Sequence, residues 1–240
     1  MATSGLHSVF TIAGFPITST LLATGVVDAV IVLLVVTVRR RLRLVPGRFQ
    51  GTIESIVEYL YTTTEQVAGS RAPMIFPWVA IFFLYIAISN LLGLLPGFGT
   101  LGFFREQGFV PLLQASTSDL NVTLALAVVS VFATHILAIR TTGLGSYLKR
   151  FFALNPLLLF VGLMEIVSEL TKFLSFSFRL YGNISAGEMV LGTMASLAAF
   201  IVPIPFLALE VLVGVIQAMI FSLLTLAFMS ILTETHAEAH

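Results

Sequence analysis

The sequence predicts an all-α integral membrane protein with about five membrane helices and one amphipathic interfacial helix. Hydrophobic residues fill 58% of the 240 positions and charged residues only 10%, and the mean hydropathy of +1.03 lies above the range of soluble domains. Because 12 basic residues balance 12 acidic ones, nucleic acid is not an expected partner. The absence of cysteine and the wide spacing of the four histidines predict no metal centre and no cofactor.

The first half of the chain contains three apolar stretches of spanning length, at residues 17–38, 74–95 and 119–139. The first is followed by arginines and lacks a basic leader, which favours a retained helix over a signal peptide. Residues 50–69 place Ile53, Leu60 and Val67 at helical spacing, with glutamates on the other side. This pattern predicts an amphipathic interfacial helix. A helix that packs on a partner subunit is a compatible alternative.

The second half predicts two further elements, at residues 157–200 and 205–232, that form a hairpin. Asn155 followed by Pro156 is a typical helix start, and the "PIP" at Pro203–Pro205 predicts the hairpin tip. As one helix, residues 157–200 would be about 66 Å long, over twice the ~30 Å hydrocarbon thickness. The segment therefore either inclines strongly or breaks near Gly182, and the sequence leaves both open. With no internal repeat, residues 1–240 are expected to form one membrane domain.

Basic residues in the connections predict the orientation of the chain. The segment 39–73, before the second span, and the segment after the third span are rich in them, whereas residues 96–118 carry one arginine. Positive residues favour the cytoplasmic side, so we expect the amino terminus and the "PIP" tip outside and the tail "TETHAEAH" in the cytoplasm. The basic residues counted are Arg39, Arg40, Arg41, Arg43, Arg48 and Arg71, then Arg140, Lys149 and Arg150, against Arg105.

Ionisable residues within the apolar stretches are the candidate functional residues, because a charge at a membrane helix centre costs about 2.5 to 3.5 kcal/mol. Asp28 and His135 also fit ordinary buried, hydrogen-bonded groups. The spacing of Glu165, Glu169 and Lys172 also fits a helix-surface ion pair. The full set is Asp28, Asp119, His135, Glu165, Glu169, Lys172, Arg179, Glu188 and Glu210.

Arg179 is the hardest of these residues to assign to packing. Its guanidinium stays protonated, so it acts only as a fixed cation. On one continuous helix Glu188 would lie about half a turn round and about 13 Å along the axis, too far to pair. Asn183 shares the arginine's face instead, as do Lys172 and Ser175.

Carboxylates lie on both sides of Arg179 along the predicted path across the membrane. Glu188 and Glu210 fall toward the outside, and Glu165 and Glu169 toward the inside. This pattern predicts two aqueous half-paths separated by a fixed positive charge. An incidental ion-pair network between helices is the structural alternative. Gln217 lies seven residues after Glu210, on the same face of the last helix.

Four segments give the chain a specific resemblance. "SFRLYGNISAGE" is followed by "IQAMIFSLLTLAFMS" and preceded by "NLLGLLP" and "SDLNVTLALA". In order and spacing the chain from about residue 39 resembles subunit a of the F-type ATP synthase in its bacterial form. The resemblance implies a multi-pass protein of the bacterial inner membrane whose last two helices form a long, strongly inclined hairpin.

The resemblance also implies partners and residue roles. Arg179 would face a ring of c subunits whose carboxylates carry the proton, with Gln217 positioning it. The external half-channel would be lined by Asn183, Asp119, Glu188 and Glu210, and Glu165 would mark the cytoplasmic one. Peripheral-stalk b subunits and the rest of the synthase would be further partners, and the chain itself would catalyse no bond chemistry.

A secondary cation/proton transporter is the alternative function, with Arg179, Glu188 and Glu210 at a mid-membrane substrate site. Such folds usually contain duplicated halves, and the sequence has no internal repeat. An intramembrane enzyme is disfavoured because HExxH and GxSxG motifs are absent.

Overall fold

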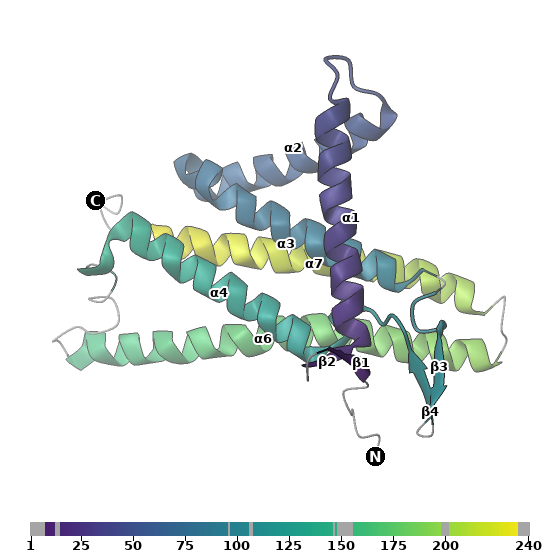
Figure 1. Cartoon of the computed structure of the whole chain (residues 1–240). Helices are drawn as coiled ribbons and strands as arrows, with labels where there is room; N and C mark the ends of the chain where they lie inside the picture. Colours follow the sequence, from purple (N-terminus) through teal and green to yellow (C-terminus); the bar gives the residue numbers. More distant parts are fainter. Residues whose placement is uncertain are drawn as a thin grey trace. The chain divides into compact units, whose positions relative to one another are not determined.

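The computed structural model describes residues 8–12, 15–95, 97–105, 108–145, 147, 156–197 and 202–234. Long helices dominate these residues (Figure 1), which confirms the all-α membrane class. Four stretches are long and apolar enough to cross a membrane: Ser19–Arg40, Arg48–Gly93, Leu120–Thr142 and Pro203–Thr233. The helices are α1 (Ser19–Arg41), α2 (Arg48–Ala68), α3 (Ala72–Gly93), α4 (Leu120–Thr142), α6 (Pro156–Leu197) and α7 (Pro203–Thr233).

Two short antiparallel hairpins accompany the helices and were not expected from the sequence. Strands β1 (Ser8–Ile12) and β2 (Phe15–Thr18) pair before α1, and β3 (Gly102–Arg105) pairs with β4 (Gly108–Pro111) between α3 and α4. Strands of four or five residues are too short to give a clear alternating pattern. The second strand leads directly into α1, where the Thr18 side chain accepts a hydrogen bond from the Leu21 amide at 3.2 Å and caps the helix.

Helix α6 is continuous over 42 residues, which answers the question that the sequence left open at Gly182. Its length is about 63 Å, so it must incline strongly if all of it lies within a bilayer. It is not among the four apolar candidate spans. Its five charged residues are Glu165, Glu169, Lys172, Arg179 and Glu188.

Several helix ends differ slightly from expectation. Helix α7 begins at Pro203, because prolines in the first turn sacrifice no intrahelical hydrogen bond; "PIP" is therefore the start of α7. The 3₁₀ turn Gly69–Arg71 links α2 directly to α3. The predicted cap Asn155, the loop residues Lys149 and Arg150, and most of the carboxyl tail lie outside the described residues.

The amphipathic helix α2 buries a narrow stripe. Leu60, Thr64 and Ala68, spaced four apart, are its buried residues, whereas Val57 and Val67 are 40% and 48% exposed. Apolar side chains left uncovered on one helix face suit a membrane interface or a partner surface.

The described residues form two compact units. Unit 1 comprises Met1–Gln50, Leu84–Leu120 and Tyr181–Ala218; unit 2 comprises Gly51–Phe83, Asn121–Leu180 and Met219–His240. Unit 2 has an apolar core of Ala68, Ile75, Val79, Ala133, Leu137, Leu226 and Met229.

Helices α6 and α7 pair in opposite directions within each unit. In unit 1, Asn183 contacts Gln217 and Gly187 lies against Glu210. In unit 2, Phe176 packs on Phe221 with ring centroids 4.8 Å apart, and Lys172, one turn earlier on α6, lies 4.2 Å from the centre of the Phe228 ring, later on α7. Residues later in α6 thus meet residues earlier in α7, as in an antiparallel hairpin.

Candidate functional site

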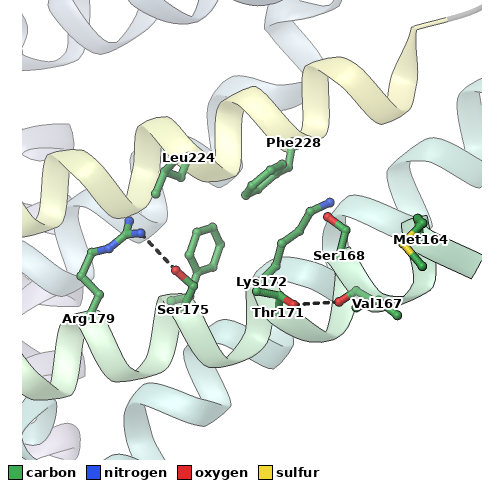
Figure 2. Close-up of a pocket in the computed structure, with 10 residues that line it drawn as sticks. Met164, Val167, Ser168, Thr171, Lys172, Ser175, Arg179, Leu224 and Phe228 are labelled. Atoms are coloured by element: carbon green, nitrogen blue, oxygen red, sulfur yellow. Dashed lines mark hydrogen bonds between the residues drawn. The ribbon is translucent and has the colours of Figure 1, made fainter. Parts of the chain in front are cut away.

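Arg179 lies in unit 2, in a groove between α6 and α7. Its Nη2 donates a hydrogen bond to Ser175 Oγ at 3.1 Å, one turn earlier on α6 (Figure 2). Among the residues that the structure describes, it has no carboxylate partner within ion-pair distance. The predicted polar stripe on this face of α6 therefore includes a direct contact between Arg179 and Ser175.

The groove around Arg179 has a volume of about 460 Å³, and we call it the Arg179 groove. Helix α6 supplies its polar side chains, and Leu224 and Phe228 of α7 lie opposite (Figure 2). Two cations, Arg179 and Lys172, line it together, so the groove combines positive charge with an apolar wall. Its polar lining residues are Ser168, Thr171, Lys172, Ser175 and Arg179.

Lys172 also belongs to a cluster of titratable groups in unit 2. Its Nζ donates to Glu169 Oε1 at 2.6 Å and lies 4.2 Å from the centre of the Phe228 ring. The second carboxylate oxygen of Glu169, Oε2, is 3.4 Å from His135 Nε2. The helix-surface ion pair expected from the spacing is present, but Glu169 is buried and the pair includes a histidine from α4.

Glu188 and Glu210 lie close together in unit 1. The Glu188 carboxyl lies near the Ser118 side chain and close enough to Glu210 for the two charges to interact. Glu210 is buried at 9% exposure and packs onto Gly187, where a Cβ atom would overlap its carboxylate. The absence of a side chain at Gly187 thus makes room for Glu210.

Asn183 and Gln217 join the same two helices in unit 1. The Asn183 Nδ2 donates to Gln217 Oε1 at 2.6 Å. Gln217 is only 2% exposed, and its Nε2 has no hydrogen-bond partner among the residues described. A buried donor without a partner is costly.

Asn90 was not a candidate from the sequence, because a neutral amide stands out less than an ionisable residue in an apolar helix. Its Nδ2 donates to the Gly214 carbonyl oxygen at 2.9 Å, and its Oδ1 accepts from Thr117 Oγ1 at 2.8 Å. Gly214 lies between Glu210 and Gln217 on α7, so Asn90 fixes α3 to the polar section of that helix. An amide inside the apolar helix α3 was the signal that could have found it.

The structure places the remaining candidates on α1, on α6 and just before α4. Asp119 follows the 3₁₀ helix Ser116–Ser118, just before α4, and accepts a hydrogen bond from Thr20 Oγ1 at 2.8 Å. Asp28 of α1 lies near Tyr85 of α3. Glu165 is partly exposed on α6, one turn before Glu169. No cluster of three or more metal-ligating side chains occurs within the described ranges.

These observations define a multi-pass membrane protein whose long apolar helices include charged and amide residues. Comparison with known proteins identifies the family. The sequence model of the family described as ATP synthase A chain matches residues 19–230, and the chain belongs to this family.

Individual relatives are similar in sequence to this chain along most of its length. The ATP synthase subunit a 1 of Hahella chejuensis is 32% identical over 88% of this chain and 82% of its own length. The ATP synthase subunit a 2 of a Bradyrhizobium strain is 34% identical over 91% and 90%. The ATP synthase subunit a of Moorella thermoacetica is 30% identical over 95% and 96%. The predicted family is therefore confirmed.

Proposed function

We propose that this chain is the proton-translocating stator subunit of a rotary ATP synthase and that Arg179 separates two half-channels within it. Membership of the ATP synthase A chain family supports the role. The contacts of Arg179 support its proposed role between the half-channels. This permanent cation of α6 donates to the neutral Ser175 and has no carboxylate partner within the described residues. A cation within a membrane helix that has no counter-ion among the described residues calls for one outside the chain.

The physical requirement is that protons cross without leaking directly. A proton crossing the membrane releases about 2.3 kcal/mol per 100 mV, and this energy drives rotation only if the proton must travel on the moving part. A guanidinium repels protons and never releases its own. Placed between two openings, Arg179 attracts the deprotonated carboxylate of a c subunit and blocks the direct path.

The remaining candidate residues receive roles that the resemblance implies. Glu188 and Glu210, close together in unit 1, line the external half-channel with Asn183 and Asp119. Two carboxylates this close repel each other when both are charged, so the pair favours holding a proton in transit. Gln217 acts with Arg179, as the resemblance implies. Glu165 marks the cytoplasmic half-channel.

The partners follow from the same proposal. The chain works within the ATP synthase, against a ring of c subunits and beside the peripheral-stalk b subunits. The distribution of basic residues supports an external amino terminus and a cytoplasmic carboxyl terminus in the bacterial inner membrane. Protons are the proposed coupling ion.

The deciding experiment replaces Arg179 in vesicles that hold the complete synthase. We expect Arg179→Ala to abolish ATP-driven acidification while the complex still assembles, as judged by co-purification of a small two-helix subunit with one membrane carboxylate. Ser175→Ala is the matched control, because it removes the hydrogen bond and keeps the cation; it should retain most pumping. Normal coupled pumping by Arg179→Ala would contradict the proposal.

A second measurement separates the stator from a transporter. Purified alone in liposomes, a cation/proton transporter exchanges ions, whereas a stator subunit without its ring does not. Ion exchange by the isolated chain would therefore favour the alternative function.

A further inference from the structure

His135 bridges α4 to two other segments of unit 2 through both of its ring nitrogens. Its Nδ1 is 2.7 Å from the Tyr147 hydroxyl, and its Nε2 is 3.4 Å from Glu169 Oε2. An imidazole with one ring nitrogen at hydrogen-bond distance and the other at ion-pair distance from titratable groups can take up a proton on one side and release it on the other.

The backbone after α4 is shaped to bring Tyr147 back to His135. Gly143 adopts φ +80°, in the left-handed region that ends helices and favours glycine. The Tyr147 amide then donates to the Gly143 carbonyl at 3.0 Å, which closes one turn. The Tyr147 and His135 rings meet edge to face, with centroids 6.0 Å apart.

Glu169 already has a full salt-bridge partner without the histidine. Lys172 occupies Oε1 at 2.6 Å, so a structural ion pair is complete, and His135 approaches the other oxygen, Oε2. A proton can thus reside on Oε2 without displacing Lys172. When Glu169 is neutral, the Lys172 cation is still stabilised by its cation–π contact with the Phe228 ring, whose centre is 4.2 Å from Nζ.

The cluster connects the end of α4 to the Arg179 groove. Tyr147, His135, Glu169 and Lys172 follow one another at hydrogen-bond or ion-pair distances, and Lys172 lines the groove together with Arg179. Within the described part of unit 2, Tyr147 and Glu169 are the titratable groups in contact with His135, and Lys172 reaches it through Glu169.

We propose that His135 is a further proton-carrying residue of this protein. It relays protons between Tyr147, which follows the end of α4, and Glu169, which lies beside the Arg179 groove. In the transfer step the Nε2–H bond of the imidazolium breaks and an O–H bond forms on Glu169 Oε2. The imidazole becomes neutral, the carboxylate becomes a carboxylic acid, and the total charge of the pair is unchanged. The Tyr147 hydroxyl, which both donates and accepts, holds Nδ1 in either state.

The inference rests on the proposed function, because it places the relay in the half-channel on the predicted cytoplasmic side. The basic residues after α4 favour that side. It extends the proposal by giving the inner half-channel an imidazole, where the sequence indicated only the carboxylates Glu165 and Glu169.

The test measures ATP hydrolysis by the complete synthase in vesicles treated with an uncoupler, where turnover requires protons to pass and no gradient accumulates. We expect His135→Gln, which keeps a hydrogen-bonding side chain but carries no proton, to slow hydrolysis by about tenfold or more. Added imidazole should restore most of the rate, and a bulky buffer of similar pKa should not. Glu169→Gln, a neutral isostere that cannot accept the proton, should show the same loss.

The matched control is Ser130→Ala on the same helix. Ser130 forms a buried hydrogen bond with Thr225 at 2.8 Å but has no titrating group, so its loss tests packing without touching the relay. We expect its rate to stay within about twofold of the parent. A parental rate in His135→Gln, or a loss that imidazole does not restore, would overturn the relay. Arg179→Ala separates the two proposals. Normal ATP-driven acidification by that variant would contradict the stator function, whatever the result for His135→Gln.

Discussion

The carboxylate of Glu210 on α7 fills the space that a side chain at position 187 of α6 would need. The three heavy atoms nearest to a Cβ built on Gly187 are all carboxyl atoms of Glu210. A glycine is therefore required here for the close approach of a buried acid to a helix backbone. Helices α6 and α7 leave room for the Glu210 carboxylate at this point because position 187 has no side chain.

Gly187→Ala should disturb this acid more than it disturbs the fold. Overpacking costs about 1 to 3 kcal/mol, and the flexible end of Glu210 can move aside, so the complex should still assemble. With the carboxyl displaced from Glu188, we expect ATP-driven acidification by vesicles to fall by about tenfold. Adding Glu210→Asp, which shortens the side chain by one methylene, should recover part of the rate.

Gly192→Ala is the control for that comparison. It lies on the same helix, and nothing comes within 4 Å of its Cβ position. If Gly187→Ala and Gly192→Ala both pump at the parental rate, the contact between Gly187 and Glu210 does not contribute to pumping.

Asn90→Leu should destabilise the packing of α3 on α7. The substitution removes hydrogen bonds to the Gly214 carbonyl and from Thr117 and leaves the fully buried Thr117 hydroxyl without its acceptor. Such a loss costs about 1 to 3 kcal/mol, measurable as a lower free energy of unfolding of the purified protein in mixed micelles. Ser89→Ala is the neighbouring control, because the buried Ser89 hydroxyl has no partner among the described residues. It should change stability by less than about 0.5 kcal/mol; equal effects of the two changes would contradict this role for Asn90.

Gly143→Ala tests the turn that returns Tyr147 to His135. A side chain at φ +80° costs about 1 to 2 kcal/mol in the left-handed region, and we expect that decrease in the same unfolding measurement. Gly145→Ala, two residues on, has no positive φ and open space at its Cβ, so it should be nearly neutral. If the two alanines are indistinguishable, the left-handed turn does not constrain this segment.

The sequence was a good guide to the long helices and a poor one to what joins them. Apolar runs of spanning length predict α1, α3, α4 and α7, because their helical form depends on local composition. Whether α6 breaks at Gly182 could not be decided, since glycine both interrupts helices and permits close contacts within them. The hairpins around β1 and β3 were missed because four or five residues carry too little periodicity.

The candidate site was predictable where a charge stood out from apolar neighbours. Arg179, Glu188 and Glu210 were found in this way, and their assigned roles remain predictions. Asn90 escaped because a neutral amide is less conspicuous, and its partner Gly214 is 124 positions away. The Tyr147 contact with His135 depends on a left-handed glycine, which no periodic pattern reveals.

The continuity of α6 has a consequence for how this chain can vary during evolution. Each residue inserted into an α-helix turns everything beyond it by about 100° and advances it by about 1.5 Å. Between Glu165 and Glu188, a single insertion or deletion would move every later side chain to another face. The number of residues in this helix is therefore constrained as tightly as the identity of any one of them, and tolerated length changes should fall in the connections at its ends.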